Sequence, residues 1–188
     1  MRKKRQYPGI PIKVCKRDII NAFKRVPLRP DYVAIFCHQF SAQSSGLTQD
    51  VAVGWLAAPF GFAESPAIFA MCTEAIQKVH HIGQAQDGSW SGWEAFWSEI
   101  FAGDAIFAEA DIGSISDETV NEWEMECRGL FGMDSINRDK VELEGDWGDT
   151  GLILGFDIDT VAETIAAPRP KVEGARTYLL SNEFVVGS

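Results

Sequence analysis

Short apolar runs bounded by polar or turn residues fill the first part of the chain. They predict a strand from Ile10 to Cys15 that ends at Asp18, followed by a short helical or turn segment over 19–24. Two more apolar runs predict strands over 32–37 and 51–57, because both are short and the first is rich in β-branched and aromatic residues. The predicted order up to this point is strand, short helix, strand, strand.

A helical period begins at Ser65-Pro66. Serine is a favoured N-cap, and proline is favoured at the first helical position. A loop over 83–92 and two strands over 93–110, with a tight turn at Gly103-Asp104, are predicted next. Apolar residues at spacings of three and four predict that one face of the helix is buried: Ile68, Met71, Cys72, Ala75, Ile76 and Val79.

The last part of the chain alternates between helix and strand again. A second helix is predicted from Asp117 to Leu130, with a cap in Ser114–Asp117. The runs 152–158 and 164–167 predict a hairpin, and a last helix begins near Lys171. Strands interleaved with helices that cover one face predict an α+β fold, and the short links between strands favour antiparallel pairing.

Composition indicates one globular domain. The 188 residues are 46% hydrophobic and 23% charged, which is near the average for globular proteins. No run approaches the ~18 apolar residues of a membrane span, and the basic start lacks the apolar core of a secretory signal, so no membrane partner is expected. The four cysteines, at 15, 37, 72 and 127, match no zinc-binding spacing. They favour reduced thiols in an intracellular protein of the cytoplasm or nucleus.

Charge is distributed unevenly along the sequence. Residues 1–31 carry ten Lys or Arg and two Asp or Glu, whereas residues 32–188 carry seven and twenty-five, and the net charge is −10. Because phosphate binding needs clustered cations, only the N-terminal segment has a suitable composition for it.

Two aspartates stand in apolar surroundings. Asp18 ends an apolar strand, and Asp104 lies at the tip of an apolar hairpin. Burial of a carboxylate is costly unless a partner compensates its charge, and Mg²⁺ binds a few carboxylates together with phosphates and water. If the two lie side by side on adjacent strands, they could hold a metal pair that stabilises both the attacking and the leaving oxygen of a phosphoryl transfer. Alternatively, each aspartate only caps a turn.

Five segments resemble the motifs of reverse transcriptases, in the order that this family has them and most like those of retrotransposon polymerases. The most specific are DIINAFKRVPLRPD, which begins at Asp18 and is similar to motif A, and APFGFAESPAIF, which is similar to motif B. The segment 171–180 resembles the start of the thumb. The motifs cover, in order, about 14–31 (A), 58–69 (B), 101–107 (C), 130–140 (D) and 152–158 (E).

The resemblance implies a polymerase palm over residues 1–180, with an antiparallel sheet, partial fingers, the start of a thumb and a tail over 181–188. It implies an RNA-directed DNA polymerase of a retroelement that uses Mg²⁺ or Mn²⁺, with an RNA/DNA template–primer and dNTP as partners. The remaining polyprotein domains (fingers, thumb and RNase H) are expected to be absent from this chain. In the family, cations of the fingers and thumb hold the nucleic acid, which fits an acidic palm.

The resemblance also implies catalytic roles for single residues. Asp18, helped by the Ile19 carbonyl, and Asp104 would bind the two catalytic metals. Lys140 would lie near the departing pyrophosphate, where a cation stabilises the developing charge. A solvated surface lysine is the alternative interpretation of Lys140.

Further roles concern the nucleotide and the primer. Phe23 would be the steric gate that clashes with a 2′-hydroxyl; the alternative interpretation is a core aromatic residue beside Val26, which is the commoner role for such a residue. Phe60 and Gly61 would contact the incoming nucleotide and the template base, where glycine suits a close backbone approach. Gly155 and Phe156 would support the primer end.

Motif C departs from the family pattern, which has two consecutive aspartates. In the preferred alignment Ala105 replaces the second aspartate, so Asp18 and Asp104 still form a metal pair. In the alternative alignment Phe101 takes the place of the motif tyrosine and Gly103 replaces the first aspartate, so that one metal ligand is lost. The resemblance therefore implies an RNA-directed DNA polymerase domain or, alternatively, a catalytically inactive relic or repurposed palm that acts as a binding module. An unrelated acidic α+β binding domain would not explain the order of the motifs.

Overall fold

A three-stranded antiparallel sheet forms the centre of the molecule. The computed structural model describes residues 2–86, 98–113 and 115–181. The strands β1 (Ile12–Asp18), β5 (Asp104–Ala110) and β4 (Ser98–Phe101) lie in the order β1-β5-β4. The turn between β4 and β5 falls at Ala102-Gly103, one residue earlier than predicted, and both residues have positive φ.

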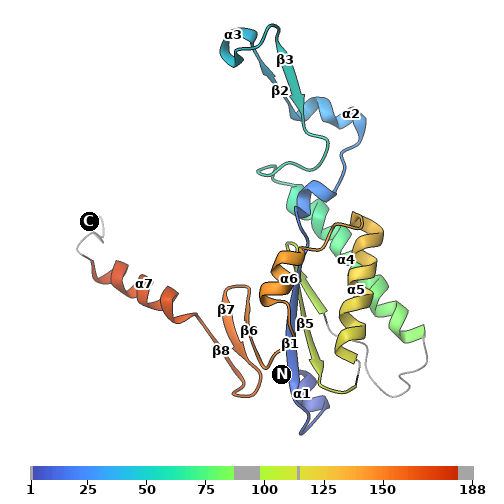
Figure 1. Cartoon of the computed structure of the whole chain (residues 1–188), viewed down its shortest axis with the longest axis vertical. Helices are drawn as coiled ribbons and strands as arrows, with labels where there is room; N and C mark the ends of the chain where they lie inside the picture. The colour runs from blue at the N-terminus through green and yellow to red at the C-terminus, as the bar shows by residue number, and fades with distance from the viewer. Residues whose placement is uncertain (1, 87–97, 114, 182–188) are drawn as a thin grey trace.

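Two long helices cover one face of this sheet. They are α4 (Ser65–Gln86) and α5 (Ile115–Phe131), which pack on each other and on β4 and β5 (Figure 1). Phe107 and Trp123 are fully buried between sheet and helix, with ring centroids 5.6 Å apart. One hydrophobic core lies between the sheet and the two helices. It contains residues of β1, β5, α4 and α5 together with Ile19 and Ile136: Cys15, Ile19, Phe69, Ile76, Ala105, Phe107, Val120, Trp123, Cys127, Phe131 and Ile136.

A buried ionic network fixes α6 (Arg138–Glu144) beside β1. Glu124 of α5 is 5% exposed and forms ion pairs with three arginines, one from each of β1, α5 and α6: Arg17, Arg128 and Arg138. Its charge is therefore compensated, as a buried carboxylate requires. The network joins the helix that carries Lys140 to the strand that ends at Asp18.

The N-terminal helix α1 (Arg2–Gln6) packs on β5. The Lys3 ammonium lies 2.8 Å from the carboxylate of Glu109, which is 2% exposed on the helix-covered face of the sheet. Part of the basic N-terminal segment thus has a structural role, because Lys3 compensates a buried acidic group.

An arm extends away from the central sheet (Figure 1). It follows η1 (Ala22–Arg25) and contains α2 (Pro30–Val33), η2 (Ala34–Phe36), β2 (Cys37–Phe40), α3 (Ala42–Ser45) and β3 (Val51–Gly54), with β2 and β3 paired antiparallel. The prediction of a strand over 32–37 is wrong, since this segment is helical up to Phe36. Pro30 at the first helical position sets the backbone for a helix, and no sheet covers the exposed side chains of Tyr32 and Ile35.

A second three-stranded sheet, in the order β6-β7-β8, lies beside β1 and leads to the last helix. Its strands are β6 (Thr150–Ile153), β7 (Phe156–Asp159) and β8 (Thr164–Ala166), and α7 (Arg169–Leu180) follows. The predicted single strand over 152–158 is instead a tight hairpin, because Leu154 and Gly155 both adopt positive φ and reverse the chain.

Several sequence predictions are confirmed at the level of elements. The strand ending at Asp18, the two long helices and the helix near Lys171 are present, and the fold is α+β with antiparallel sheets. The helix from Ser65 continues to Gln86, into the region predicted as a loop, while 87–92 of that loop lie outside the described residues. The same holds for 93–97 of the predicted strand, for the proposed cap residue Ser114 and for 182–188 of the tail.

No helix within the described ranges has both the length and the apolar character needed to span a bilayer.

His80 gives the packing of α4 on α5 a pH dependence. Its side chain is 2% exposed, its Nε2 lies 3.1 Å from the Thr119 carbonyl oxygen, and burial lowers its pKa to about 4. The unfolded chain binds a proton at His80 below pH 6.5, whereas the folded chain does so only near pH 4. Stability is therefore lost as the pH falls through this window, by about 1–3 kcal/mol. Urea unfolding from pH 7 to 4.5 should show this loss, and a His80→Gln variant should show a smaller one. Equal pH profiles for the two proteins would contradict this role of His80.

Candidate active site

Asp18 and Asp104 stand directly opposite each other in the antiparallel ladder between β1 and β5. Side chains alternate between the faces of a strand. Because Ala105 points into the core and Arg17 reaches Glu124 of α5, both aspartates project from the other face of the sheet. Side chains directly opposite in such a pair have Cβ atoms about 4.5–5.5 Å apart. The expectation that the two aspartates lie side by side on adjacent strands is confirmed.

The two carboxylates interact electrostatically. The pKa of Asp104 is raised, chiefly by burial and further by the hydrogen bond and the negative charge of Asp18, while Lys140 and Lys16 act in the opposite direction. Asp104 is thus a carboxylate whose ionised form is disfavoured by its surroundings. A cation placed against it would remove that penalty.

Helix α6 supplies two partners to Asp18. The Lys140 Nζ donates to Oδ1 at 2.9 Å, and the Asn137 Nδ2 donates to Oδ2 at 2.8 Å. Asn137 is also the N-cap of α6, where its side-chain oxygen accepts from the Lys140 backbone N–H. The structure therefore brings Asp18, Asp104 and Lys140 together, and it adds Asn137, which the motif comparison did not single out.

The two ring-bearing residues proposed for nucleotide binding contact each other. Phe23 and Phe60 meet edge to face with centroids 5.2 Å apart, and Phe23 also meets Phe69 of the core at 5.4 Å. Phe60 is 81% exposed. Gly61 has φ +90°, and a Cβ added to it would meet nothing within 4 Å. Both interpretations of Phe23 thus retain support, since one side of its ring packs on the core and another meets an exposed ring.

The turn that precedes Asp104 lies against the chain that follows Asp18. The Ile19 backbone N–H donates to the Gly103 carbonyl at 2.9 Å. A Cβ at Gly103 would lie 3.2 Å from the Ala22 Cβ and 3.9 Å from the Ile19 carbonyl oxygen. The same Cβ would lie 4.0 Å from the Phe69 ring, so position 103 faces the core and the segment after Asp18. Ala105 is also fully buried on the core face of the sheet. A carboxylate at 105 could not join Asp18.

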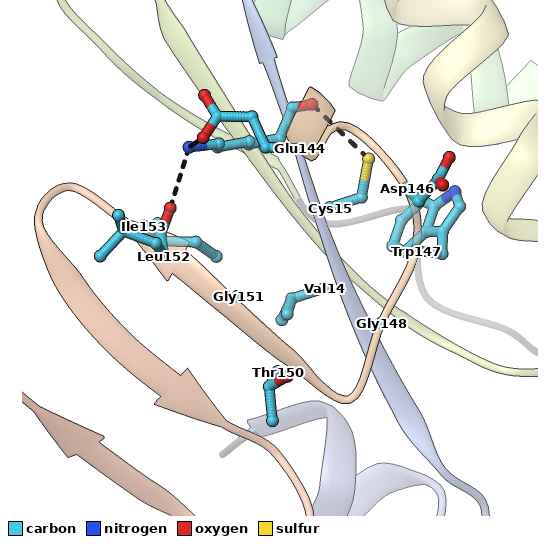
Figure 2. Close-up of a pocket in the computed structure, with 11 residues that line it drawn as sticks. Val14, Cys15, Glu144, Asp146, Trp147, Gly148, Thr150, Gly151, Leu152 and Ile153 are labelled. Carbon is cyan, nitrogen blue, oxygen red and sulfur yellow. Dashed lines mark hydrogen bonds and ion pairs between the residues drawn. The ribbon is translucent and has the colours of Figure 1, made fainter. Parts of the chain in front are cut away.

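The predicted primer-end residues lie on the neighbouring hairpin. Lys16 of β1 connects the hairpin to this strand, because its Nζ donates to the Leu152 carbonyl at 3.0 Å and pairs with Glu144 at 2.9 Å. A cavity of about 330 Å³ lies between β1, the segment 144–148 and β6 (Figure 2). Gly155 has φ +79° at the hairpin turn, and Phe156 is half-exposed. Among the residues that the structure describes, no hydrogen bond joins Gly155 or Phe156 to Asp18 or Asp104.

The donor set suits a hard divalent cation. Mg²⁺ uses one or two carboxylates together with substrate phosphates and water, rather than a cage made entirely of protein groups. Asp18 and Asp104, directly opposite each other in the ladder, provide such a pair. No group of three or more His, Cys, Asp or Glu side chains suited to a metal occurs among the residues that the structure describes.

Sequence reasoning did not find Asn137 or Lys16. Asn137 could have been found, because an asparagine before a short polar helix is a common N-cap. Lys16 carries no motif signal; its place follows only from alternation, which puts residues 16 and 18 on the same face of the strand.

Comparison with known proteins supports the fold. No protein-family profile and no curated protein sequence matches this chain. Among solved structures, it is similar to a foamy viral protease–reverse transcriptase in complex with double-stranded DNA. The TM-score is 0.62 and the sequence identity 13%, and the match covers 87% of this chain and 24% of that chain. The chain therefore has a reverse-transcriptase-like fold and spans about a quarter of that protein.

Proposed function

We propose that this chain is the palm domain, over residues 1–180, of an RNA-directed DNA polymerase of a retroelement. The observation that carries the proposal is the cross-strand pair of Asp18 and Asp104 on the face of the central sheet away from α4 and α5, which we call the open face. The same two aspartates occupy motif-like positions in the sequence, and the fold is similar to that of a reverse transcriptase bound to double-stranded DNA.

In this proposal, Asp18, the Ile19 carbonyl and Asp104 hold Mg²⁺ or Mn²⁺. A bound metal pair supplies electrostatic stabilisation of the attacking and leaving oxygens during nucleotidyl transfer. The chain's own contribution is to fix two carboxylates on rigid strands and to hold a cationic side chain, Lys140, beside them. That ammonium is placed to meet negative charge that develops on the departing pyrophosphate.

The incoming dNTP is proposed to bind beside the Phe23–Phe60 ring pair. Phe23 is fixed by its packing on Phe69, so its edge can exclude a 2′-hydroxyl, while the open space at Gly61 admits the nucleotide or the template base. Gly155 and Phe156, on the hairpin that Lys16 joins to β1, would support the primer end.

Primer extension by the native chain tests this function. An RNA template with an annealed DNA primer, dNTPs and Mg²⁺ or Mn²⁺ should give extended primer, and EDTA should abolish the product because the carboxylate pair alone cannot stabilise the reacting oxygens. The readout is the length of the labelled primer. Absence of extension with both metals would overturn the proposal that this chain catalyses the reaction.

A second candidate is a palm that no longer catalyses and serves as a binding module. The observation in its favour is that Ala105 faces the core, so motif C offers only Asp104 to the open face from its two candidate positions, 104 and 105. This candidate predicts the same fold and retained binding of template–primer without extension. A gel-shift assay run beside the extension assay separates the two.

A further inference from the structure

Both carboxylate oxygens of Asp18 are held by side chains of one short helix. The Lys140 Nζ donates to Oδ1 at 2.9 Å, and the Asn137 Nδ2 donates to Oδ2 at 2.8 Å. The Asn137 contact is a hydrogen bond from an uncharged amide at a helix cap. The Lys140 contact is an ion pair in which the lysine side chain is 46% exposed and the Asp18 side chain 20% exposed. The ammonium therefore stands on the solvent side of the carboxylate and can leave it without unfolding α6.

We infer that Lys140 is a resident counter-cation of the Asp18–Asp104 pair, which a divalent cation displaces from Asp18 Oδ1 and which thereby sets the affinity of the site for metal. The inference rests on the proposed function, because it takes Asp18 and Asp104 as the metal ligands. Binding of a divalent cation to Asp18 and release of the Lys140 ammonium from Asp18 Oδ1 are then a single exchange.

Electrostatics supports the exchange. Two carboxylates opposite each other repel, and Lys140 is the largest influence that counteracts the raised pKa of Asp104. The Lys140 ammonium lies 2.9 Å from Asp18 Oδ1, and Asp18 stands directly opposite Asp104, so one positive charge serves two neighbouring carboxylates. A divalent cation at Asp18 would repel this ammonium.

The released ammonium has a use in the proposed reaction. Lys140 lies in the first turn of α6, with its backbone fixed by the Asn137 cap. On leaving Oδ1, its side chain stays within reach of the same site and can pair with a phosphate that arrives with the metal. One residue then serves as counter-cation before the metal binds and as phosphate contact afterwards.

Lys16 offers an internal comparison. It lies on the same face of β1 as Asp18 and also lowers the pKa of Asp104. Its Nζ, however, forms an ion pair with Glu144 and donates to the Leu152 carbonyl. Removal of Lys16 changes the charge near the pair without freeing an oxygen of Asp18. Removal of Lys140 does both.

Titration of Mn²⁺, followed by the loss of its free-ion EPR signal, tests the inference on the full chain without substrate. We expect Lys140→Met to bind Mn²⁺ about tenfold more tightly than the native chain, since loss of a competing unit charge at this distance is worth roughly a factor of ten. Lys140→Arg, which keeps the charge, should stay within about threefold of the native affinity, and Lys16→Met should change it by less than Lys140→Met. Circular dichroism confirms that each variant is folded.

The outcomes separate the inference from the function on which it rests. Equal Mn²⁺ affinity for the native chain and Lys140→Met, or an equal gain in Lys140→Met and Lys16→Met, would overturn the counter-cation role while the metal site itself stands. Failure of both the native chain and Lys140→Met to bind Mn²⁺ would overturn the metal site and the inference together.

Discussion

Replacement of Asp104 by asparagine should lower metal-dependent primer extension at least about a hundredfold. Mutation of residues that merely hydrogen-bond to a metal ligand already lowers metal affinity or activity about 10–100-fold, and Asp104 is a proposed ligand itself. The amide keeps the size and shape of the side chain but removes the charge that a metal needs. The free energy of unfolding should not fall. Burial and the neighbouring Asp18 both raise the pKa of Asp104, so a neutral side chain relieves repulsion.

The expected signature is therefore lost activity with unchanged or higher thermal stability. Asp111→Asn is the matched control, because Asp111 follows the same strand and its side chain is 53% exposed. This control should extend primers at nearly the native rate. Native-like extension by Asp104→Asn would contradict the proposed role of the cross-strand pair.

Replacement of Ala105 by aspartate should destabilise the fold by roughly 3–5 kcal/mol, the cost of leaving a buried charge without a partner. Ala105 is fully buried in the core that contains Phe107 and Phe69. A sequence alignment alone makes this substitution look like a repair of motif C. The strand alternation shows that it would place the carboxylate among apolar side chains, on the face away from Asp18.

Urea unfolding measures this effect, with Ala108→Asp as the control. Ala108 lies on the same strand but on the opposite, partly exposed face, so the same substitution there should cost about 1 kcal/mol or less, within the usual range for sites away from the core. An Ala105→Asp variant that folds like the native chain and binds Mn²⁺ more tightly would show that position 105 can reach the metal site.

The sequence predicted the central part of the candidate site because two strong local signals coincide there. The first apolar strand ends at Asp18, and a tight turn precedes Asp104 at the start of β5. Antiparallel pairing of these two strands places the two aspartates opposite each other. The helices after Ser65 and Asp117 were predicted from their apolar stripes, which pack on each other and on the sheet.

The sequence did not predict parts whose structure depends on distant partners. The segment 32–37 has the composition of a strand, yet Pro30 begins a helix there, and strand pairing with β3 starts only at Cys37. Helix α6 is short and polar, and it is fixed by Arg138 on the buried Glu124 and by Asn137 on Asp18. Local propensity contains no information about such contacts, so the two hydrogen bonds that α6 makes to Asp18 became visible only in the structure.

Anomalous diffraction from a crystal of the native chain soaked in Mn²⁺ would locate a bound metal without relying on activity. We expect a peak that contacts carboxylate oxygens of both Asp18 and Asp104, with the Lys140 side chain moved off Asp18. A crystal that holds Mn²⁺ elsewhere, with the Lys140–Asp18 ion pair intact and no peak between the two aspartates, would contradict this expectation.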